Sequence, residues 1–388
     1  MDNLRVTWVV SHPIQYYAPL FQELSKFQEV DLTICYLSRR GTNPYFDKEF
    51  SRVIQFDTDL LSGYNYVFLR NFSSIKNSLN FFAHINPGIA SQILRNSDTV
   101  IFQGWNSVSS FIGILLCILN KKPFFIRSDS NILGLTFKKN FVVTLKRVVK
   151  HILIVPLLKK CTGVLTIGKR NEEYFRKLGI QDSKFLRVPF SVDIKKFTQT
   201  ADGKMELKSR FCLEFNFNPK KKIFLFVGKI RVSKGVFDLL DQAKHMPDSY
   251  FVFVGDGPDL ERLEKLSVSL PNVLIMGFRN QSELPAIYGA ADFIIMPSHY
   301  EAWGLAVNEG IAAGCVPIVS DVCGCSPELV ETTSNLIFES QNRNAFSKVL
   351  QNALLQDSKQ VYLDLLNVCS EHSIESSANK FIKAILDS

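Results

Sequence analysis

Two carboxylates lie close together in the stretch PSHYEAWGLAVNEGIAAGCVPIVSD, which begins at Pro297. Glu301 and Glu309 stand on either side of a Trp-Gly-Leu, so Gly304 and Leu305 lie between them. A carboxylate accepts hydrogen bonds from ligand hydroxyls, and the first amides of a helix suit a phosphate. The stretch therefore predicts an anion-binding turn with two acids. On spacing alone, Glu301 could equally be a solvated loop acid and Glu309 an exposed helix position.

The surrounding pattern predicts the elements that hold these acids. The run ADFIIMPS has the length of a buried strand and stops at a proline, and LAVNEGIAAG has helical spacing and ends at Gly314. The run CVPIVSD then supplies the next buried strand. This order is a β-α-β unit, in which the turn lies at the carboxyl end of a parallel strand.

Lysines follow another predicted strand end. In KIFLFVGKIRVSKG, Gly228 ends the strand, and Lys229 and Lys234 lie in the next loop. Two cations at this edge would suit a diphosphate, although a lysine-rich surface loop is the simpler alternative. A second strand-to-glycine turn, Gly255 to Gly257, lacks the full glycine spacing of a dinucleotide site, so NAD binding is weakly supported.

The whole chain repeats this kind of unit. Its 388 residues predict two domains. The predicted strands of the first half are RVTWVV, DLTICYL, NYVFLR, DTVIFQG, PFFIRSD and GVLTIG, and those of the second half are KKIFLFVG, SYFVFVGDG, NVLIMGF, ADFIIMPS and CVPIVSD. We expect an α/β protein with two Rossmann-like, doubly wound parallel-sheet domains facing a cleft. The expected domains are 1–190 and 191–372, joined by the turn-rich PFSVDIKKFTQTADGK, with a helix at about 373–388 packing back on the first.

Composition excludes several classes of protein. No run reaches the length of a membrane-spanning helix, and the first residues do not resemble a signal peptide, so a cytoplasmic protein is expected. The eight cysteines are mostly scattered singly, as reduced core thiols would be. Cys323-Gly324-Cys325 has no further ligand at suitable spacing, and no metal is expected.

The charge is uneven along the chain. Residues 1–200 hold 27 Lys and Arg against 14 Asp and Glu, whereas the remainder holds 18 against 23. The densest basic segment, residues 138–160, has seven basic residues, no acidic ones and helical apolar spacing. It predicts either a helix on an anionic membrane surface or an ordinary helix with a solvated basic face. No nucleic-acid-binding motif accompanies the charge.

Taken together, these motifs resemble a known family. PSHYEAWGLAVNEGIAAGCVPIVS followed by GCSPELV, VGKIRVSKGVFDLL, IMGF and PFSVDIKKF occur in the order typical of retaining GT-B glycosyltransferases of the family 4 type. The resemblance covers nearly the whole chain. It implies transfer of a sugar from a nucleotide-diphosphate sugar, with UDP or GDP as the nucleotide. The acceptor would be a glycan or a lipid-linked sugar in bacterial cell-surface polysaccharide or glycolipid synthesis, and no cofactor or metal would be needed.

The resemblance also implies residue roles. Lys229 and Lys234 would hold the diphosphate together with the amides of Gly304 and Leu305. Glu309 would bind the ribose, and Glu301 would contact the donor sugar near its transferring carbon. The backbone of Gly277 and Phe278 would read the base. Glu301 and Lys234 are thus catalytic candidates.

The chain also departs from many relatives. His12 and Pro13 replace a glycine pair, and Asp129 replaces a histidine after PFFIR. We interpret Asp129, near Arg127, as a third catalytic candidate that faces the sugar or acceptor, although it could be a helix N-cap acid. Asp57-Thr58-Asp59 is interpreted as unrelated to the nucleotide site.

Three functions therefore remain to be compared: a nucleotide-sugar transferase, a nucleotide-sugar epimerase on the same fold, and a non-catalytic membrane-binding subunit. An epimerase would need further acid-base residues, for which only Asp129 and His12 present themselves. The intact set of Glu301, Glu309, Lys229 and Lys234 argues against a non-catalytic protein.

Overall fold

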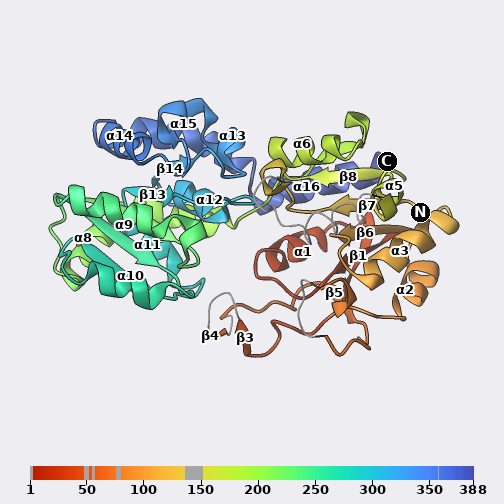
Figure 1. Cartoon of the computed structure of the whole chain (residues 1–388). Coiled ribbons are helices and arrows are strands. Elements are labelled where there is room, and N and C mark those ends of the chain that lie inside the picture. The colour runs from red at the N-terminus through yellow and green to blue at the C-terminus, as the bar shows by residue number, and fades with distance from the viewer. Residues whose placement is uncertain (1–2, 48–51, 55–56, 76–79, 136–151, 357) are drawn as a thin grey trace. The chain divides into compact units, whose positions relative to one another are not determined.

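A computed structural model describes residues 3–47, 52–54, 57–75, 80–135, 152–356 and 358–388. The chain divides into two compact units, shown in Figure 1. The first contains Met1–Tyr45, Asp59–Ser191 and Ile374–Ser388, and the second contains Phe46–Thr58 and Val192–Ser373. Each unit is built on its own parallel sheet, which confirms the predicted α/β class with two parallel-sheet domains.

The first unit has a seven-stranded sheet with strand order β5-β2-β1-β6-β7-β8-β9. Its strands are β1 (Leu4–Val10), β2 (Val30–Tyr36), β5 (Asn65–Phe68), β6 (Thr99–Gln103), β7 (Phe124–Arg127), β8 (Gly163–Thr166) and β9 (Phe185–Arg187). Its helices are α1 (Ala18–Leu24), η1 (Phe81–Ala83), α2 (Ile89–Asn96), α3 (Val108–Leu119), η2 (Ile132–Leu135), α5 (Val155–Leu158), α6 (Lys169–Lys177), η3 (Asp182–Lys184) and α16 (Ile374–Leu386).

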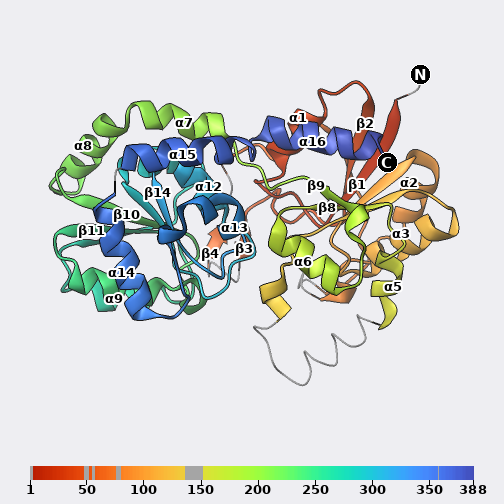
Figure 2. The ribbon, with the colours of Figure 1, turned by 90° about the horizontal axis from the view of Figure 1, so that it is seen from above.

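Alternate side chains of β1 pack on opposite faces of this sheet, as the pleat of a strand requires. Trp8 stacks on Phe381 of α16, with 5.0 Å between ring centroids and an interplanar angle of 2°. Val9 belongs to the core that also contains Ile93 of α2 and Ile114 of α3. The C-terminal helix α16 thus packs beside α1 on the first sheet, as Figures 1 and 2 both show.

The second unit has a six-stranded sheet with strand order β12-β11-β10-β13-β14-β15. Its strands are β10 (Lys222–Val227), β11 (Ser249–Val254), β12 (Val273–Gly277), β13 (Phe293–Met296), β14 (Val316–Ser320) and β15 (Ile337–Phe338). Its helices are α7 (Ile194–Asp202), α8 (Lys204–Glu214), η4 (Val232–Lys234), α9 (Val236–His245), α10 (Leu260–Ser267), α11 (Leu284–Ala290), α12 (Leu305–Ala312), α13 (Ser326–Leu329), η5 (Glu331–Leu336), α14 (Arg343–Leu354) and α15 (Ser358–Ser370). A separate pair of short strands, β3 (Tyr45–Asp47) and β4 (Arg52–Ile54), precedes β5 in the chain.

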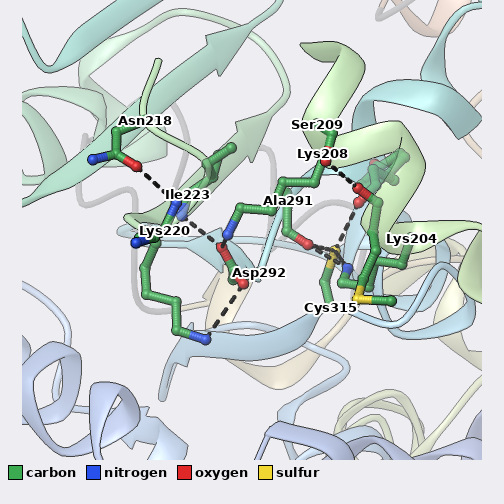
Figure 3. A network of polar contacts seen from close by, with 12 residues as sticks. Lys204, Lys208, Ser209, Asn218, Lys220, Ile223, Ala291, Asp292 and Cys315 are labelled. Carbon is green, nitrogen blue, oxygen red and sulfur yellow. Dashed lines mark hydrogen bonds and ion pairs between the residues drawn. The ribbon is translucent and has the colours of Figure 1, made fainter. Parts of the chain in front are cut away.

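Asp292, the residue before β13, ties a helix to the amino-terminal edge of the second sheet. Its Oδ2 accepts from Nζ of Lys208 on α8 at 2.7 Å and from the backbone amide of Ile223 on β10 at 2.8 Å. Figure 3 shows this network and the neighbouring contact of Lys204 with the carbonyl of Ala291. The network stabilises the edge of the sheet opposite the strand ends discussed below, so its role is structural.

Most of the local sequence predictions agree with the structure. Each apolar run predicted as a strand lies in one of the two sheets, whereas the short strands β9 and β15 were not predicted. The boundary between the two units falls inside the predicted linker PFSVDIKKFTQTADGK, between Ser191 and Val192. The segment is less turn-rich than predicted, because it contains α7, whose first turn is capped by the Asp193 side chain at the amide of Lys196.

Part of the basic segment lies outside the described residues. Of residues 138–160, the first fourteen are not described, and α5 occupies Val155–Leu158. The prediction of a basic amphipathic helix there stays a prediction. Within the part of the chain that the structure describes, no helix is long and apolar enough to span a bilayer.

Candidate active site

The topology of the second sheet places two loops side by side. Strand β10 pairs with β11 on one side and with β13 on the other. The chain adds β11 and β12 outward on the first side and then β13, β14 and β15 outward on the second, so the strand order reverses at β10. Ligands of open α/β sheets bind at the carboxyl ends of strands at such a switch point. The loop after β10 carries Lys229 and Lys234, and the loop after β13 carries Glu301 and Gly304. The structure therefore brings together residues that the sequence predicted in separate motifs.

Glycines allow these loops to approach closely. Gly235, which follows Lys234, has φ +68°, and a Cβ there would lie 2.0 Å from the carbonyl oxygen of Pro297. A Cβ on Gly255 would lie 1.8 Å from the carbonyl oxygen of Gly228. Any other residue at Gly235 would push apart the loops after β10 and β13, and any other residue at Gly255 would push apart the loops after β10 and β11. In both cases the obstacle is backbone rather than a flexible side chain.

Lys234 and Glu301 form an ion pair across the two loops. Their side chains are only 20% and 17% exposed, respectively. The backbone of Glu301 is held as well, because its carbonyl accepts from the amide of Gly324 at 3.1 Å. Glu301 is therefore not a solvated loop acid, and the simpler alternative for it is wrong.

The Cys323-Gly324-Cys325 turn supports the same loop. A Cβ on Gly324 would lie 1.9 Å from the carbonyl oxygen of Ala302, and the amide of Cys325 donates to the carbonyl of Trp303 at 3.0 Å. Both cysteines are buried free thiols. Burial raises the pKa of Cys325 well above its usual value. This turn packs against the loop of Glu301, and no group that could hold a metal occurs among the residues that the structure describes.

Helix α12 begins at the predicted anion-binding turn. Gly304 is its N-cap in a left-handed conformation, with φ +104°, and Leu305 is its first residue. The first amides of any helix lack a partner within that helix, so they can donate to an anion placed before it. The side chain of Trp303 fixes this turn, since its Nε1 donates to Asn308 Oδ1 at 3.0 Å.

Glu309 lies one turn inside α12 and is only 5% exposed, so the alternative of an exposed helix position is wrong. Its Oε2 accepts from the hydroxyl of Tyr288 on α11 at 2.7 Å. Burial raises the pKa of Glu309 to about 7, although hydrogen bonds from Tyr288 and Gln281 oppose the shift. A carboxyl group that ionises near neutral pH would gain from any ligand that brings further hydrogen-bond donors to it.

Sequence reasoning missed Tyr288 and Gln281 as partners of Glu309. Tyr288 is fully buried in a helix whose sequence, LPAIYGA, is typical of core packing. Gln281 follows β12, and its carbonyl accepts from Nζ of Lys196 at 2.6 Å. No local pattern marks either residue, because each meets Glu309 only through the packing of α11 and the β12 loop beside α12.

The predicted base readers are Gly277, the last residue of β12, and Phe278, the first residue after it. Gly277 has φ +67°, and its carbonyl accepts from the amide of Gly255 at 2.8 Å. One lone pair of that carbonyl is thus occupied by the protein. The structure places both residues at the carboxyl end of β12, two strands away from β10 in the sheet order.

The interpretation of Asp57 needs a correction. Asp57 was expected to lie away from the nucleotide loops, but its Oδ2 accepts hydrogen bonds from the amide and hydroxyl of Ser282. Burial alone would raise the pKa of Asp57, and the hydrogen bonds from Ser282 outweigh it, so that pKa is lowered. Asp59 instead accepts from the amides of Leu61 and Ser62. The two acids therefore hold different loops.

Asp129 belongs to the first unit. It is exposed and follows β7, whose last residue, Arg127, is fully buried. The guanidinium of Arg127 donates to the carbonyl of Val188 at 2.7 Å and to that of Pro189 at 3.3 Å. Burial raises the pKa of Tyr17 to about 12, an effect that Arg127 opposes and Asp129 reinforces. Asp129 is thus part of a polar cluster at the carboxyl edge of the first sheet.

The switch point of the first sheet lies between β1 and β6. His12 follows β1, and its Nδ1 lies 2.8 Å from Oγ of Ser11. Gln103 ends β6, and its Nε2 donates to the hydroxyl of Tyr17 at 2.8 Å. The sequence named His12 at this position, and it missed Gln103 and Tyr17.

Comparison with known proteins finds a family match for part of the chain. Residues 213–365 match the model of the family "Glycosyl transferases group 1". The chain is 35% identical over 115 residues to sulfoquinovosyl transferase SQD2 of Arabidopsis thaliana, spanning 30% of this chain and 22% of that protein. It is 24% identical over 309 residues to N,N'-diacetylbacillosaminyl-diphospho-undecaprenol alpha-1,3-N-acetylgalactosaminyltransferase of Campylobacter jejuni, spanning 76% of this chain and 80% of that protein.

A solved structure shows the same fold along the full length. The structure of Anabaena Alr3699/HepE in complex with UDP superposes with a TM-score of 0.76 at 13% identity and covers 100% of both chains. This likeness agrees with the two parallel sheets. The family match lies within the second unit and includes Lys229, Lys234, Glu301 and Glu309. Residues 213–365 therefore match the glycosyl transferases group 1 family, and the chain as a whole has the two-domain GT-B fold.

Proposed function

We propose that this glycosyltransferase moves a sugar from a nucleotide-diphosphate sugar, with UDP as the first candidate nucleotide, to a lipid-linked or glycan acceptor. The observation that carries the proposal is the ion pair between Lys234 and Glu301 beside the first amides of α12. A cation, a helix N-terminus and a carboxylate at one sheet switch point suit a diphosphate joined to a polyhydroxylated group. The preference for UDP is supported by the Anabaena relative of known structure, which binds that nucleotide.

In this proposal the second unit holds the donor through separate contacts. Lys229, Lys234 and the amides of Gly304 and Leu305 would bind the diphosphate, and Glu309 would accept hydrogen bonds from the two ribose hydroxyls. Because an ionised carboxylate accepts such bonds best, ribose binding would favour the charged form of Glu309 and release its proton near neutral pH. Gly277 and Phe278 would contact the base.

Chemistry would then take place next to Glu301. The bond between the sugar anomeric carbon and the diphosphate oxygen breaks, and the acceptor hydroxyl oxygen bonds to the same carbon on the same face, which retains the configuration. The hydroxyl proton passes to the departing diphosphate. Lys234 and the α12 amides would stabilise the charge that develops on that diphosphate, and Glu301 would orient the sugar. This sequence requires no metal and no cofactor.

The acceptor would contact the first unit. Asp129 lies exposed at the carboxyl edge of the first sheet and would accept a hydrogen bond from an acceptor or sugar hydroxyl. The Campylobacter relative is named for a polyprenyl-diphosphate-linked acceptor, which supports a lipid-linked substrate here. A protein that works on such a substrate would act at the inner face of the plasma membrane, in cell-surface polysaccharide or glycolipid synthesis.

A panel of nucleotides tests the donor. Thermal unfolding should shift upward most with UDP among UDP, GDP and ADP, because stabilisation follows ligand concentration relative to affinity. Slow release of free sugar from the preferred donor without acceptor would support a transferase. Formation of a 2-epimer would support an epimerase instead, and the comparisons do not favour that alternative. Absence of stabilisation by any nucleotide would contradict the proposal.

A further inference from the structure

Helix α3 presents an aliphatic face to solvent. Its sequence is VSSFIGILLCIL, which contains no charged residue. Its inner face packs into the core through Ile114 and Cys117. The positions on the other side at helical spacing are Val108, Ile112, Leu115 and Leu119, and these are half-buried or exposed. Leu119 is 77% exposed.

Helix α6, which also lies on the surface of the first unit, has charged residues at its exposed positions, unlike α3. The exposed positions of α6 are Lys169, Glu173, Arg176 and Lys177, all charged. That arrangement is normal for a helix with one buried face. A helix that is apolar on all sides is expected to be covered on all sides, so the outward stripe of α3 indicates a partner surface.

Neighbouring elements extend the apolar surface. Helix α3 contacts α2, η1 and α5, and Figures 1 and 2 both show it between α2 and α5. Phe82 of η1 is 56% exposed, and Ile152, just before α5, is 64% exposed. Leu94 of α2 and Leu153 are also exposed. We call this surface, made by α3 with Phe82, Leu94, Ile152 and Leu153, the aliphatic face.

The charged residues around the aliphatic face are mostly basic. On α2, α3 and α5 and the turns that follow them, the basic residues are Arg95, Lys121, Lys122, Lys159 and Lys160, and the acidic residue is Asp98. Asp98 is neutralised by Arg5, whose Nη2 lies 2.6 Å from its Oδ1. The rim of the aliphatic face is therefore positive, which complements a surface that is apolar inside and negatively charged outside.

We propose that the aliphatic face docks on an anionic lipid bilayer, with the α3 stripe at the level of the acyl chains and the basic rim at the headgroups. Apolar burial and attraction of lysines to anionic headgroups are the two terms that bind interfacial helices. A second copy of the chain is a poorer occupant, because a symmetric pair would place two basic rims against each other. The inference rests on the proposed function, since it would hold the first unit where a lipid-linked acceptor is presented.

A site-specific fluorescent probe tests the docking in the full-length protein. All eight native cysteines are buried, so Leu119→Cys supplies an accessible thiol for an environment-sensitive dye such as nitrobenzoxadiazole. We expect its emission to rise several-fold on vesicles of phosphatidylcholine and phosphatidylglycerol, and less on phosphatidylcholine alone. Leu213→Cys is the matched control, because Leu213 is 86% exposed but lies on α8 of the second unit. Its dye should not respond.

Two results would overturn the proposal. One is an emission from the Leu119 probe that does not change with anionic vesicles even at low salt. The other is a Leu119 thiol that an aqueous maleimide cannot reach in the absence of vesicles, because the aliphatic face would then be covered by another part of the chain or by a second copy. Light scattering of the same sample gives the molar mass, which distinguishes a second copy from another part of the same chain.

Variants link the docking to catalysis. Ile112→Asp combined with Leu119→Asp should reduce co-flotation with anionic vesicles by about tenfold or more, since charge is placed where acyl chains would lie. Transfer to a vesicle-embedded acceptor should fall with it, whereas hydrolysis of the donor and transfer to a short-chain soluble acceptor should persist. Leu213→Asp is the control. A protein that docks but neither hydrolyses nor transfers any donor would refute the proposed function and leave the membrane inference standing.

Discussion

The hydroxyl of Tyr288 donates a hydrogen bond to the buried carboxyl group of Glu309, with 2.7 Å between the two oxygens. This bond joins α11 to α12 and opposes the effect of burial on Glu309. The ionisation of Glu309 therefore depends on how α11 and α12 pack, and two predictions follow from this.

Tyr288→Phe should weaken nucleotide binding at neutral pH. The variant removes the donor that favours the charged carboxylate, so Glu309 would have to ionise at a greater cost when ribose binds. We expect a loss on the order of 1–2 kcal/mol by calorimetry with the nucleotide that stabilises the protein best. Tyr250→Phe is the control, because the Tyr250 hydroxyl accepts from the amide of Asn218 at 2.9 Å near the opposite edge of the sheet. Equal losses in the two variants would contradict the assignment.

Glu309→Gln should stabilise the unliganded protein at pH 8 and leave its stability nearly unchanged at pH 5. Burial raises the pKa of Glu309 from 4.5 to about 7, so the folded state keeps a proton that the unfolded state loses above about pH 4.5. The free energy of unfolding therefore falls as pH rises through this window, by at most about 3 kcal/mol. Urea unfolding at both pH values measures the difference in the free energy of unfolding between the variant and the unchanged protein, and Glu339→Gln, at an exposed position, is the control. If this difference does not grow with pH, the pKa of Glu309 is not raised in the folded protein.

Lys234→Ala should lower kcat more than it raises KM. The charge of Lys234 matters most when the departing diphosphate gains charge, which is an interaction stronger in the transition state than in the ground state. Initial rates over a range of donor concentrations separate the two effects, and Lys265→Ala, on the exposed helix α10, controls for loss of charge in the same unit. If KM alone rises, the lysine is a ground-state binding group.

Gly235→Ala should destabilise the second unit and impair nucleotide binding together. The alanine would have to adopt an unfavourable φ of +68°, and its Cβ would lie 2.0 Å from the carbonyl oxygen of Pro297. Strain of this kind costs roughly 1–3 kcal/mol, and the Lys234 loop must shift to relieve it. Gly203→Ala is a matched control, since a Cβ there meets no atom within 4 Å. Thermal unfolding and nucleotide titration of both variants test the contrast, and a Gly235 variant with normal binding would refute it.

Asp57→Ala should weaken nucleotide binding several-fold, whereas Asp59→Ala should not. Asp57 holds the loop after β12 through the amide and hydroxyl of Ser282, and Asp59 caps a turn at Leu61 in the first unit. The two substitutions remove the same group two residues apart, so charge and composition are matched. Equal affinities in both variants would show that the Ser282 contact does not shape the nucleotide pocket.

The amino-acid sequence by itself determined the elements and the order of the site motifs. Apolar runs that stop at Gly, Pro or Asp define buried parallel strands, because such strands need no polar alternation. The spacing of Glu301, Gly304 and Glu309 fixed a turn and a helix start, since helix and strand geometry repeat over a few residues. The fold class and the positions of the two lysines, the two acids and the helix start therefore followed from local patterns. The base readers Gly277 and Phe278 and the roles of all these residues came from the resemblance to the glycosyltransferase family.

Only the tertiary structure decided which of these groups meet. Lys234 pairs with Glu301 because β10 and β13 are neighbours in the sheet, and Ser282 meets Asp57 from the other half of the chain. Burial of Glu309 beside Tyr288 sets a pKa near 7 where spacing allowed an exposed acid. The outward stripe of α3 was not predicted either, because the sequence of an apolar helix does not show which of its sides is covered by other residues and which is exposed. Such properties depend on contacts between residues far apart in the chain, which no local period encodes.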